Sequence, residues 1–173
     1  MSTLTVLLLV FAQVSVSYSW WWHATGPQVQ MIEARSGPLR LEYGTGRYRD
    51  AGVLSQPMSL WSADYVWPSG YYLGWSSISV DHSTLTGPRL GLVRSLLLAR
   101  HLRLETDVFL APFNSLHGRV SPVGLGLAFG LRYDPLPGMQ VRFGRRERQH
   151  FFSARPGDDW NFPGWSLGVR MTW

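Results

Sequence analysis

The sequence contains no cysteine, so disulfide bonds, cysteine-ligated zinc and thiol catalysis are excluded. Charged residues are scarce as well, at 16% of the 173 residues against roughly 25% in average soluble domains. No segment reaches 18 unbroken apolar residues, which excludes a transmembrane helix. The HExxH and P-loop motifs are missing too, so we expect neither a metal nor a cofactor.

Aromatic residues and glycine are abundant instead. Aromatics make up 14% of the chain and hydrophobic residues 45%, and a chain of this composition can bury enough surface to order itself. Its length fits one domain. The net charge of +5 is compatible with nucleic acid or with anionic lipid as a partner. The only dense basic run, Arg145-Arg146-Glu147-Arg148, is too small a footprint for nucleic acid, so we expect lipid.

The N-terminal segment is typical of an export signal. Residues 4–16 are nearly all apolar, and two small-x-small patterns, at 15–17 and at 17–19, suit cleavage. We therefore predict a signal peptide over residues 1–19 and a single β-barrel domain over residues 20–173. No Lys or Arg precedes the apolar stretch, which leaves a buried first strand or helix as the alternative. Residues 20–36 either extend the first strand of the domain or lead into it.

Apolar residues occupy every second position in most of the remaining chain. Between Val123 and Tyr133, for example, large apolar side chains alternate with Gly, Ala and Arg. A period of two predicts strands with one apolar and one polar face. In the third expected strand Ile78 and Val80 fall out of phase, and in the fourth Arg94 interrupts the apolar face; a β-bulge would explain either shift. The eight expected strands cover residues 38–48, 57–67, 70–80, 87–98, 101–111, 122–133, 138–149 and 164–173.

The lengths of the connections predict how the strands are arranged. Three connections are short, and the alternate ones are mostly longer; the short ones are 68–70, 99–100 and 134–137, and the longer ones about 49–56, 81–86, 112–121 and 150–163. Short turns at one end and longer loops at the other are typical of outer-membrane barrels, and strands of about ten residues can cross a membrane when tilted. We therefore predict an all-β fold, an eight-stranded antiparallel up-and-down transmembrane β-barrel.

The polar faces of the strands carry mainly small residues and a few charges of both signs. Such faces suit a narrow interior that neutralises its own charge, and the charges expected there are Asp64, Arg103, Glu105, Asp107, Arg132 and Arg142. Large aromatic residues at strand ends suit the girdles that outer-membrane barrels place at both membrane interfaces. These aromatics are Trp61, Trp67, Trp165 and Trp173.

A soluble lipocalin-like lipid-binding barrel is the alternative architecture, because it holds the same strands with their apolar faces inside. The orientation of Leu125, Leu127, Val169 and Met171 distinguishes the two. A transmembrane barrel requires these side chains to point outward, and a soluble barrel requires them inside.

An apolar signal, amphipathic strands and a final strand ending in the aromatic Trp173 resemble the outer-membrane barrels of Gram-negative bacteria. The last third resembles the lipid A deacylases of the PagL type, whose signature is a His-x-Ser-Asn segment at the outer end of a late strand, followed by a Pro-Gly-x-acid turn. The resemblance implies an outer-membrane serine esterase that removes an acyl chain from lipid A, the anchor of lipopolysaccharide, or from a related glycolipid. The corresponding stretches are His150-Phe151-Phe152-Ser153-Ala154 and Pro156-Gly157-Asp158-Asp159.

The same resemblance implies a serine-hydrolase triad. His150 would be the general base, Ser153 the nucleophile, and Asp159, or Asp158, the acid that orients the imidazole. A serine hydroxyl is a weak nucleophile and needs both partners. His150 and Ser153 are three positions apart, and residues three apart in a strand face opposite ways, so the triad requires a bulge between them.

Further groups at the same rim fit a lipid substrate. The oxyanion candidates are the backbone N–H of Gly157 and the side-chain amide of Asn161. Aromatic residues would form a shelf for an acyl chain, and arginines would pair with lipid phosphates. The shelf comprises Phe151, Phe152, Trp160 and Phe162, and the arginines are Arg145, Arg146, Arg148 and Arg155.

Two other interpretations stay open. A non-enzymatic eight-stranded outer-membrane barrel would serve adhesion, defence or a structural role through its outer loops. With either function we expect the barrel to be a monomer or a homodimer. A second cluster, Asp81-His82-Ser83, lies on a predicted loop at the same rim. Adjacent residues of an extended chain point to opposite faces, so this cluster does not form a triad by itself.

Overall fold

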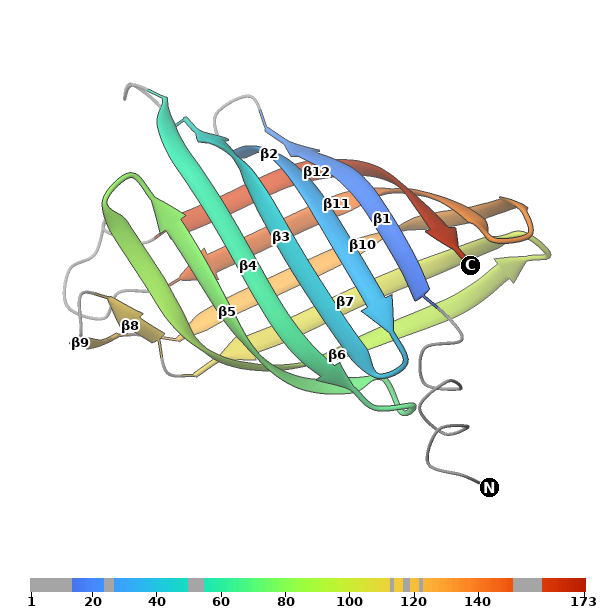
Figure 1. Ribbon diagram of the computed structural model, residues 1–173, viewed down its shortest axis with the longest axis horizontal. Helices are drawn as coiled ribbons and strands as arrows, with labels where there is room; N and C mark the ends of the chain where they lie inside the picture. The colour runs from blue at the N-terminus through green and yellow to red at the C-terminus, as the bar shows by residue number, and fades with distance from the viewer. Residues whose placement is uncertain are drawn as a thin grey trace.

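The computed structural model describes residues 14–23, 27–49, 55–112, 114–116, 119–121, 123–150 and 160–173. Within these residues the chain forms β-strands joined by turns and loops (Figure 1). No helix in the described part of the chain is long and apolar enough to span a membrane. In chain order the strands are β1 (Val14–Trp22), β2 (Pro27–Ser36), β3 (Leu39–Tyr48), β4 (Gln56–Val66), β5 (Tyr71–Val80), β6 (Ser83–Ala99), β7 (Leu102–Ala111), β8 (Asn114–Leu116), β9 (Arg119–Ser121), β10 (Gly124–Leu136), β11 (Met139–His150) and β12 (Trp160–Thr172).

Ten of these strands close into an antiparallel barrel. Consecutive strands from β1 to β7 pair with each other, β7 pairs with β10, and β10, β11 and β12 follow in order. The barrel closes where β12 pairs with β1, from Ser15 opposite Thr172 to Trp22 opposite Trp165. The short strands β8 and β9 form a hairpin that pairs with β6 at Leu85. Each barrel strand thus has a partner on both sides, which protects the edges that an open sheet would expose.

The expected eight strands correspond to β3–β7 and β10–β12, so the prediction of eight was wrong. The two additional strands, β1 and β2, come from residues 14–36, which the sequence interpretation divided between a signal peptide and a lead-in. In β1, Val16, Tyr18 and Trp20 are exposed on the outer face and alternate with serines. This alternation was missed because β1 directly follows the apolar N-terminal run and was interpreted together with it.

β1 also overlaps the predicted signal peptide. Residues Ser15 to Ser19 pair with both β2 and β12. Cleavage after Ser17 or Ser19 would remove these residues from the strand that closes the barrel. The cleavage site stays a prediction, and the pairing of β1 favours a position before Val14.

One end of the barrel, termed the turn end, has short connections, which span residues 37–38, 67–70, 100–101 and 137–138. Gly37, Gly70 and Gly138 have φ angles of 54°, 86° and 78° in these turns, the left-handed region that glycine adopts without a steric penalty. Val14 and Trp173 also meet at this end, where the Trp173 N–H donates to the Val14 carbonyl at 3.0 Å. In outer-membrane barrels the short turns face the periplasm.

The opposite end, termed the loop end, carries mostly longer connections, as predicted. They span residues 23–26, 49–55, 112–123 and 151–159. The exception is the connection between β5 and β6, which was expected to be a loop over residues 81–86. It is a turn at Asp81-His82, because β6 already begins at Ser83. Asp81 has a φ of 53°, a conformation that Asp tolerates better than most residues.

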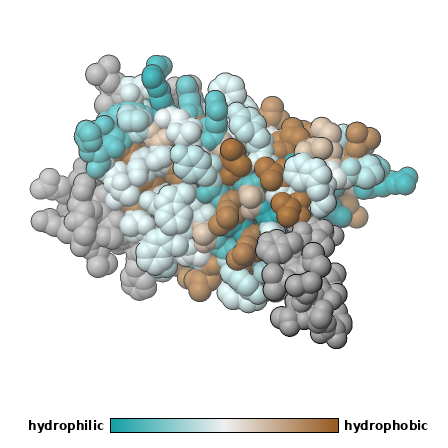
Figure 2. Space-filling model, in the orientation of Figure 1, coloured by the Kyte–Doolittle hydropathy of each residue, from teal (hydrophilic) through white to brown (hydrophobic). Residues whose placement is uncertain are grey.

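The apolar faces of the strands point outward. Leu125, Leu127, Val169 and Met171 are 44%, 43%, 39% and 42% exposed, which confirms the predicted orientation and excludes the soluble lipocalin-like barrel. All four tryptophans predicted for the interfacial girdles are exposed as well. In Figure 2, brown apolar and pale aromatic side chains cover much of the wall, while hydrophilic ones gather at the upper left, where the loop ends of β2 to β4 lie in Figure 1.

The irregular pattern in β5 has a different cause from the predicted bulge. β5 pairs with β4 and β6 without any shift of register. Tyr71, Leu73 and Trp75 are exposed on the outer face, whereas Ile78 and Val80 are buried inside the barrel. The apolar residues change face along the strand because the interior is apolar near the loop end. In β6 the register shift lies between Leu97 and Ala99, and not at Arg94.

Candidate functional site

The predicted catalytic residues lie at or beyond the loop ends of β11 and β12. His150 is the last residue of β11, and its Cα partners are Trp160 in β12 and Gly124 in β10. Most of the other predicted site residues fall in the segment 151–159, which lies outside the described residues, so their catalytic and binding roles stay predictions. These residues are Phe151, Phe152, Ser153, Arg155, Gly157, Asp158 and Asp159.

The register of β11 and β12 brings the two ends of that segment together. The two strands pair without a shift from Met139 opposite Met171 to His150 opposite Trp160. His150 and Trp160, the residues that flank the segment 151–159, therefore lie directly opposite each other on neighbouring strands. Arg148 and Asn161 lie in the same ladder, where Asn161 is opposite Gln149.

Arg145 and Arg146, both predicted to pair with lipid phosphates, lie on opposite faces of β11. Arg145 is on the outer face, where it donates to the Glu147 carboxylate at 2.7 Å and lies 5.8 Å from the ring centre of Trp165. Arg146 is on the inner face and forms an ion pair with Glu42 at 3.2 Å. Of these two arginines, Arg145 is therefore the one placed to meet a lipid without leaving an interior partner.

The Asp81-His82-Ser83 cluster forms an exposed turn at the loop end. His82 Nε2 lies 3.6 Å from Asp81 Oδ1, and the His82 side chain is 95% exposed. Ser83 pairs through its backbone with Val80 at the start of β6. These residues make no triad among themselves, as the sequence indicated. No group of three or more His, Asp or Glu side chains placed to hold a metal ion occurs in the described part of the chain.

Asp64 is the centre of an ion-pair network inside the barrel. Its side chain is fully buried, and it accepts hydrogen bonds from Arg40 Nε at 2.8 Å and from Arg89 Nε at 2.7 Å. The Arg89 guanidinium also lies 3.5 Å from the Glu42 carboxylate, which in turn accepts a hydrogen bond from Ser62 at 3.1 Å. Because both arginines are almost completely buried, their charges depend on these carboxylates for compensation.

Asp107 extends this network to β7. It accepts hydrogen bonds from Arg40 Nη1 at 2.8 Å and from the Tyr72 hydroxyl at 2.7 Å. The Arg40 guanidinium lies 4.3 Å from the ring centre of Tyr72, within the range of a cation–π contact. The network thus links β3, β4, β5, β6 and β7 across the interior.

A second network lies on β2, β7 and β10–β12. Glu33 pairs with Arg35 at 2.6 Å and with Arg170. Glu105 pairs with Arg132 at 3.0 Å and with Arg142 at 3.1 Å. The prediction of interior charges of both signs is therefore confirmed for Asp64, Glu105, Asp107, Arg132 and Arg142. Arg40, Glu42 and Arg170 also alternate with apolar residues on the polar faces of β3 and β12, as the sequence pattern indicates. Glu33 and Arg89, which complete the networks, were missed.

Among the described residues, buried apolar side chains gather on the loop side of the interior. These side chains form one buried cluster, termed the plug, in which Trp21 is fully buried and Phe162 is 1% exposed. Gly164 leaves room for the plug, because a Cβ there would lie 2.2 Å from the Trp21 ring nitrogen. Phe162, predicted as part of an acyl-chain shelf, belongs to the plug. Its members are Trp21, Val29, Met31, Met58, Leu60, Ile78, Val80 and Phe162.

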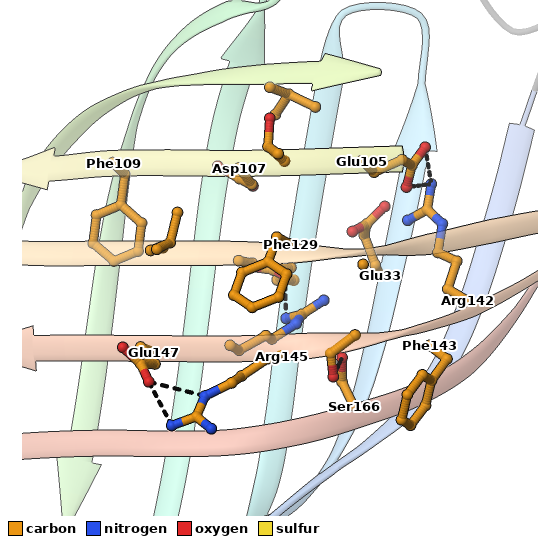
Figure 3. A pocket seen from close by; sticks show the side chains of 18 of the residues that line it. Glu33, Glu105, Asp107, Phe109, Phe129, Arg142, Phe143, Arg145, Glu147 and Ser166 are labelled. Atoms are coloured by element: carbon orange, nitrogen blue, oxygen red, sulfur yellow. Dashed lines mark hydrogen bonds and ion pairs between the residues drawn. The ribbon is translucent and has the colours of Figure 1, made fainter. Parts of the chain in front are cut away.

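The barrel contains a cavity of about 110 Å³ between β3 and β6 on one side and β10 and β11 on the other (Figure 3). One wall carries Arg40, Glu42 and Arg89, and the other carries the small residues Ala128 and Gly130 together with Arg142 and Arg146. The cavity has room for several water molecules. It lies inside the barrel, and charged residues of both ion-pair networks contribute to its lining.

The geometry defines the class of protein. The barrel is closed, antiparallel and even-stranded, with short turns at one end, an apolar outer surface and charges inside. Only a helix or a closed barrel satisfies its backbone hydrogen bonds in lipid, and even-stranded antiparallel barrels of this form are those of bacterial outer membranes. The chain is therefore a Gram-negative outer-membrane β-barrel, and its surroundings are a membrane that contains lipopolysaccharide.

Known outer-membrane barrels have similar structures. The N-terminal barrel domain of Pseudomonas aeruginosa OprF has a TM-score of 0.42 and 11% identity over 94% of this chain and 98% of that domain. Neisserial surface protein A has a TM-score of 0.35 and 17% identity, covering 92% and 94% of the two chains. OmpT of Vibrio cholerae has a TM-score of 0.37 and 11% identity over 91% of this chain, which spans 64% of OmpT.

No protein-family model and no curated protein matches the sequence. At these identities and TM-scores the three structural likenesses say nothing about function. Membership of the PagL-type deacylases is not shown, and the assignment to outer-membrane barrels rests on the closure, the outer surface and the charged interior described above.

Proposed function

We propose that the protein is a sealed barrel that acts through its loop end and does not conduct solutes. The observation that supports this proposal is the plug, a cluster of buried apolar side chains on the loop side of the interior. A conducting pore needs a continuous path of water, and an apolar constriction removes water from such a path. The ion pairs on the turn side narrow the interior further, because nearly every charged group there is bonded to a group of opposite charge.

The sealed interior predicts that the purified protein produces no resolved conductance steps in planar lipid bilayers. Trp21→Ala is expected to introduce measurable conductance, because it removes the largest side chain of the plug. Trp20→Ala is the matched control, since Trp20 is the neighbouring residue on the outer face. Conductance steps in the unaltered protein, or equal conductance in both variants, would contradict the proposal.

We further propose that the reaction at the loop end is hydrolysis of an acyl ester of lipid A or a related glycolipid. His150 would take the proton of the Ser153 hydroxyl, whose oxygen attacks the ester carbonyl and displaces the alcohol. Water activated by His150 would then release the fatty acid from Ser153, with Asp159 orienting the imidazole. The pairing of His150 with Trp160 supports this proposal, because it brings the two residues that flank the segment 151–159 to the same point of the rim. The outward position of Arg145 beside Trp165 also supports contact with lipid.

Mass spectrometry of lipid A from expressing cells tests this reaction. Ser153→Ala is expected to reduce fatty-acid release by at least about 10⁴-fold, as loss of a serine nucleophile does in other triads. Ser83→Ala, at another loop-end turn, is expected to leave release unchanged. Equal release by Ser153→Ala and the unaltered protein would exclude Ser153 as the nucleophile. Intact lipid A in cells that express the unaltered protein would leave the non-enzymatic barrel as the function.

A further inference from the structure

The outer surface of the barrel is apolar over very different heights on different strands. On β12, five large outward residues run without interruption from Trp165 to Trp173. On β5, only Tyr71, Leu73 and Trp75 are large and outward. Beyond Trp75 the outer face of β5 continues with Ser77 and Ser79, and Ser79 forms a hydrogen bond with Thr84 on β6 at 2.8 Å.

Aromatic residues show where the two membrane interfaces lie on each strand, because outer-membrane barrels place aromatic girdles at both. On β12 the girdle residues Trp165 and Trp173 are eight residues apart, which is about 27 Å along a strand and about 20 Å along the normal of a tilted barrel. On β5, Tyr71 and Trp75 are four residues apart, which gives about 10 Å along the normal.

The difference in apolar height between β5 and β12 arises at the turn end. Tyr71 is opposite Leu92, yet β6 continues to Ala99, so the β6–β7 hairpin projects beyond the turn between β4 and β5. Figure 1 shows the hairpins β6–β7 and β10–β11 reaching farther to the right than the turns that join β2 to β3 and β4 to β5. The apolar residues Leu96 and Leu98 lie on this projecting part of β6.

Arg94 lies beside β5 where we expect the membrane interface of the turn end. It is exposed, and its guanidinium donates to the carbonyl of Ser69 at 2.6 Å and lies 5.8 Å from the ring centre of Tyr71. An arginine on the lipid face is strongly destabilising at the bilayer midplane and costs almost nothing at the interface. The position of Arg94 therefore fits a membrane interface at the level of Tyr71, on the turn-end side of the short apolar band.

We propose that the wall formed by β3–β5 thins the periplasmic leaflet of the membrane beside it. A bilayer adapts to a short apolar surface by thinning locally, at a modest cost for each ångström. The partner of this surface is a lipid bilayer of reduced hydrocarbon thickness, while β10–β12 contact bilayer of ordinary thickness. The protein then holds a step in membrane thickness around its circumference, whatever reaction its loops perform.

Spin labels at two matched positions test this proposal, and the absence of cysteine allows each label to be placed singly. Tyr71→Cys and Val169→Cys each lie four residues from an exposed tryptophan of the same strand, Trp75 and Trp165. In phosphatidylcholine vesicles, the label at position 71 is expected to collide several-fold more often with a water-soluble nickel chelate than the label at position 169. Equal collision rates would overturn the proposal.

A tilt of the whole barrel is distinguished by labels at the loop end. Thinning predicts equal depths for the labels of Trp75→Cys and Trp165→Cys. A tilt of the barrel instead makes the depth of the β5 label differ from that of the β12 label by the same amount at the loop end and at the turn end. That result would also overturn the proposal. Arg94→Leu is expected to move the label at position 71 deeper into the hydrocarbon. Arg100→Leu, in the turn at the tip of the β6–β7 hairpin, is expected to leave it in place.

Discussion

Asp64→Ala is expected to destabilise the barrel by about 3–5 kcal/mol, because it leaves two buried arginines without their shared carboxylate. Asp64 accepts hydrogen bonds from both Arg40 and Arg89, and all three side chains are at most 3% exposed. Asp107 compensates part of the Arg40 charge, and Glu42 lies 3.5 Å from Arg89, but neither is placed to replace both contacts. The midpoint of urea unfolding in lipid vesicles, followed by tryptophan fluorescence, measures the effect.

Asp134→Ala is the matched control for this prediction. Asp134 also bonds an arginine, Arg132, at 2.9 Å, but the two side chains are 26% and 18% exposed near the turn end. Water replaces much of what such a pair contributes, so we expect a loss of at most about 1 kcal/mol. Similar losses in the two variants would show that water screens Asp64 as effectively as it screens Asp134, and burial would then not strengthen the ion pairs of Asp64.

The outward orientation of the strands could be predicted because the faces opposite the apolar ones carry mainly small residues and few charges, which suits a narrow interior. Leu127 and Val169 lie on the apolar faces of β10 and β12, and both are exposed on the outside of the barrel. The number of strands was predicted wrongly because β1 and β2 carry different patterns. β1 follows an apolar run, and β2 has buried Val29 and Met31 alternating with Gln28 and Gln30 near its loop end, so its apolar face there is the inner one.

The interior was predictable only in part. Alternate charges such as Glu105 and Asp107 indicate inner-face positions, and the structure confirms them. Their partners come from strands far apart in the sequence: Arg40 and Asp107 are 67 residues apart and Glu33 and Arg170 are 137 apart. Such pairings follow from closure and register, which sequence periodicity does not specify. The plug was missed for the same reason, since its members are contributed by β1, β2, β4, β5 and β12.

A chain that begins at Trp20 is expected not to form the barrel, because it lacks most of β1. Residues Ser15 to Ser19 bridge β2 and β12, and without them both strands expose unpaired backbone groups to hydrocarbon. Each backbone group without a partner in lipid costs several kcal/mol, so the loss exceeds the stability of an ordinary domain. A chain that begins at Gln13 keeps all of β1 and is expected to fold.

Both chains can be exported behind the same unrelated signal peptide and compared by their resistance to denaturation in unheated gel samples. The chain from Gln13 should migrate as a folded barrel and the chain from Trp20 should not. Mass spectrometry of the full-length product then locates the natural cleavage, which we expect before Val14, where Ala12 offers the small residue that signal cleavage requires. A folded barrel that begins at Tyr18 or Trp20 would show that β12 and β2 close without β1, and the ten-stranded closure would not describe the mature protein.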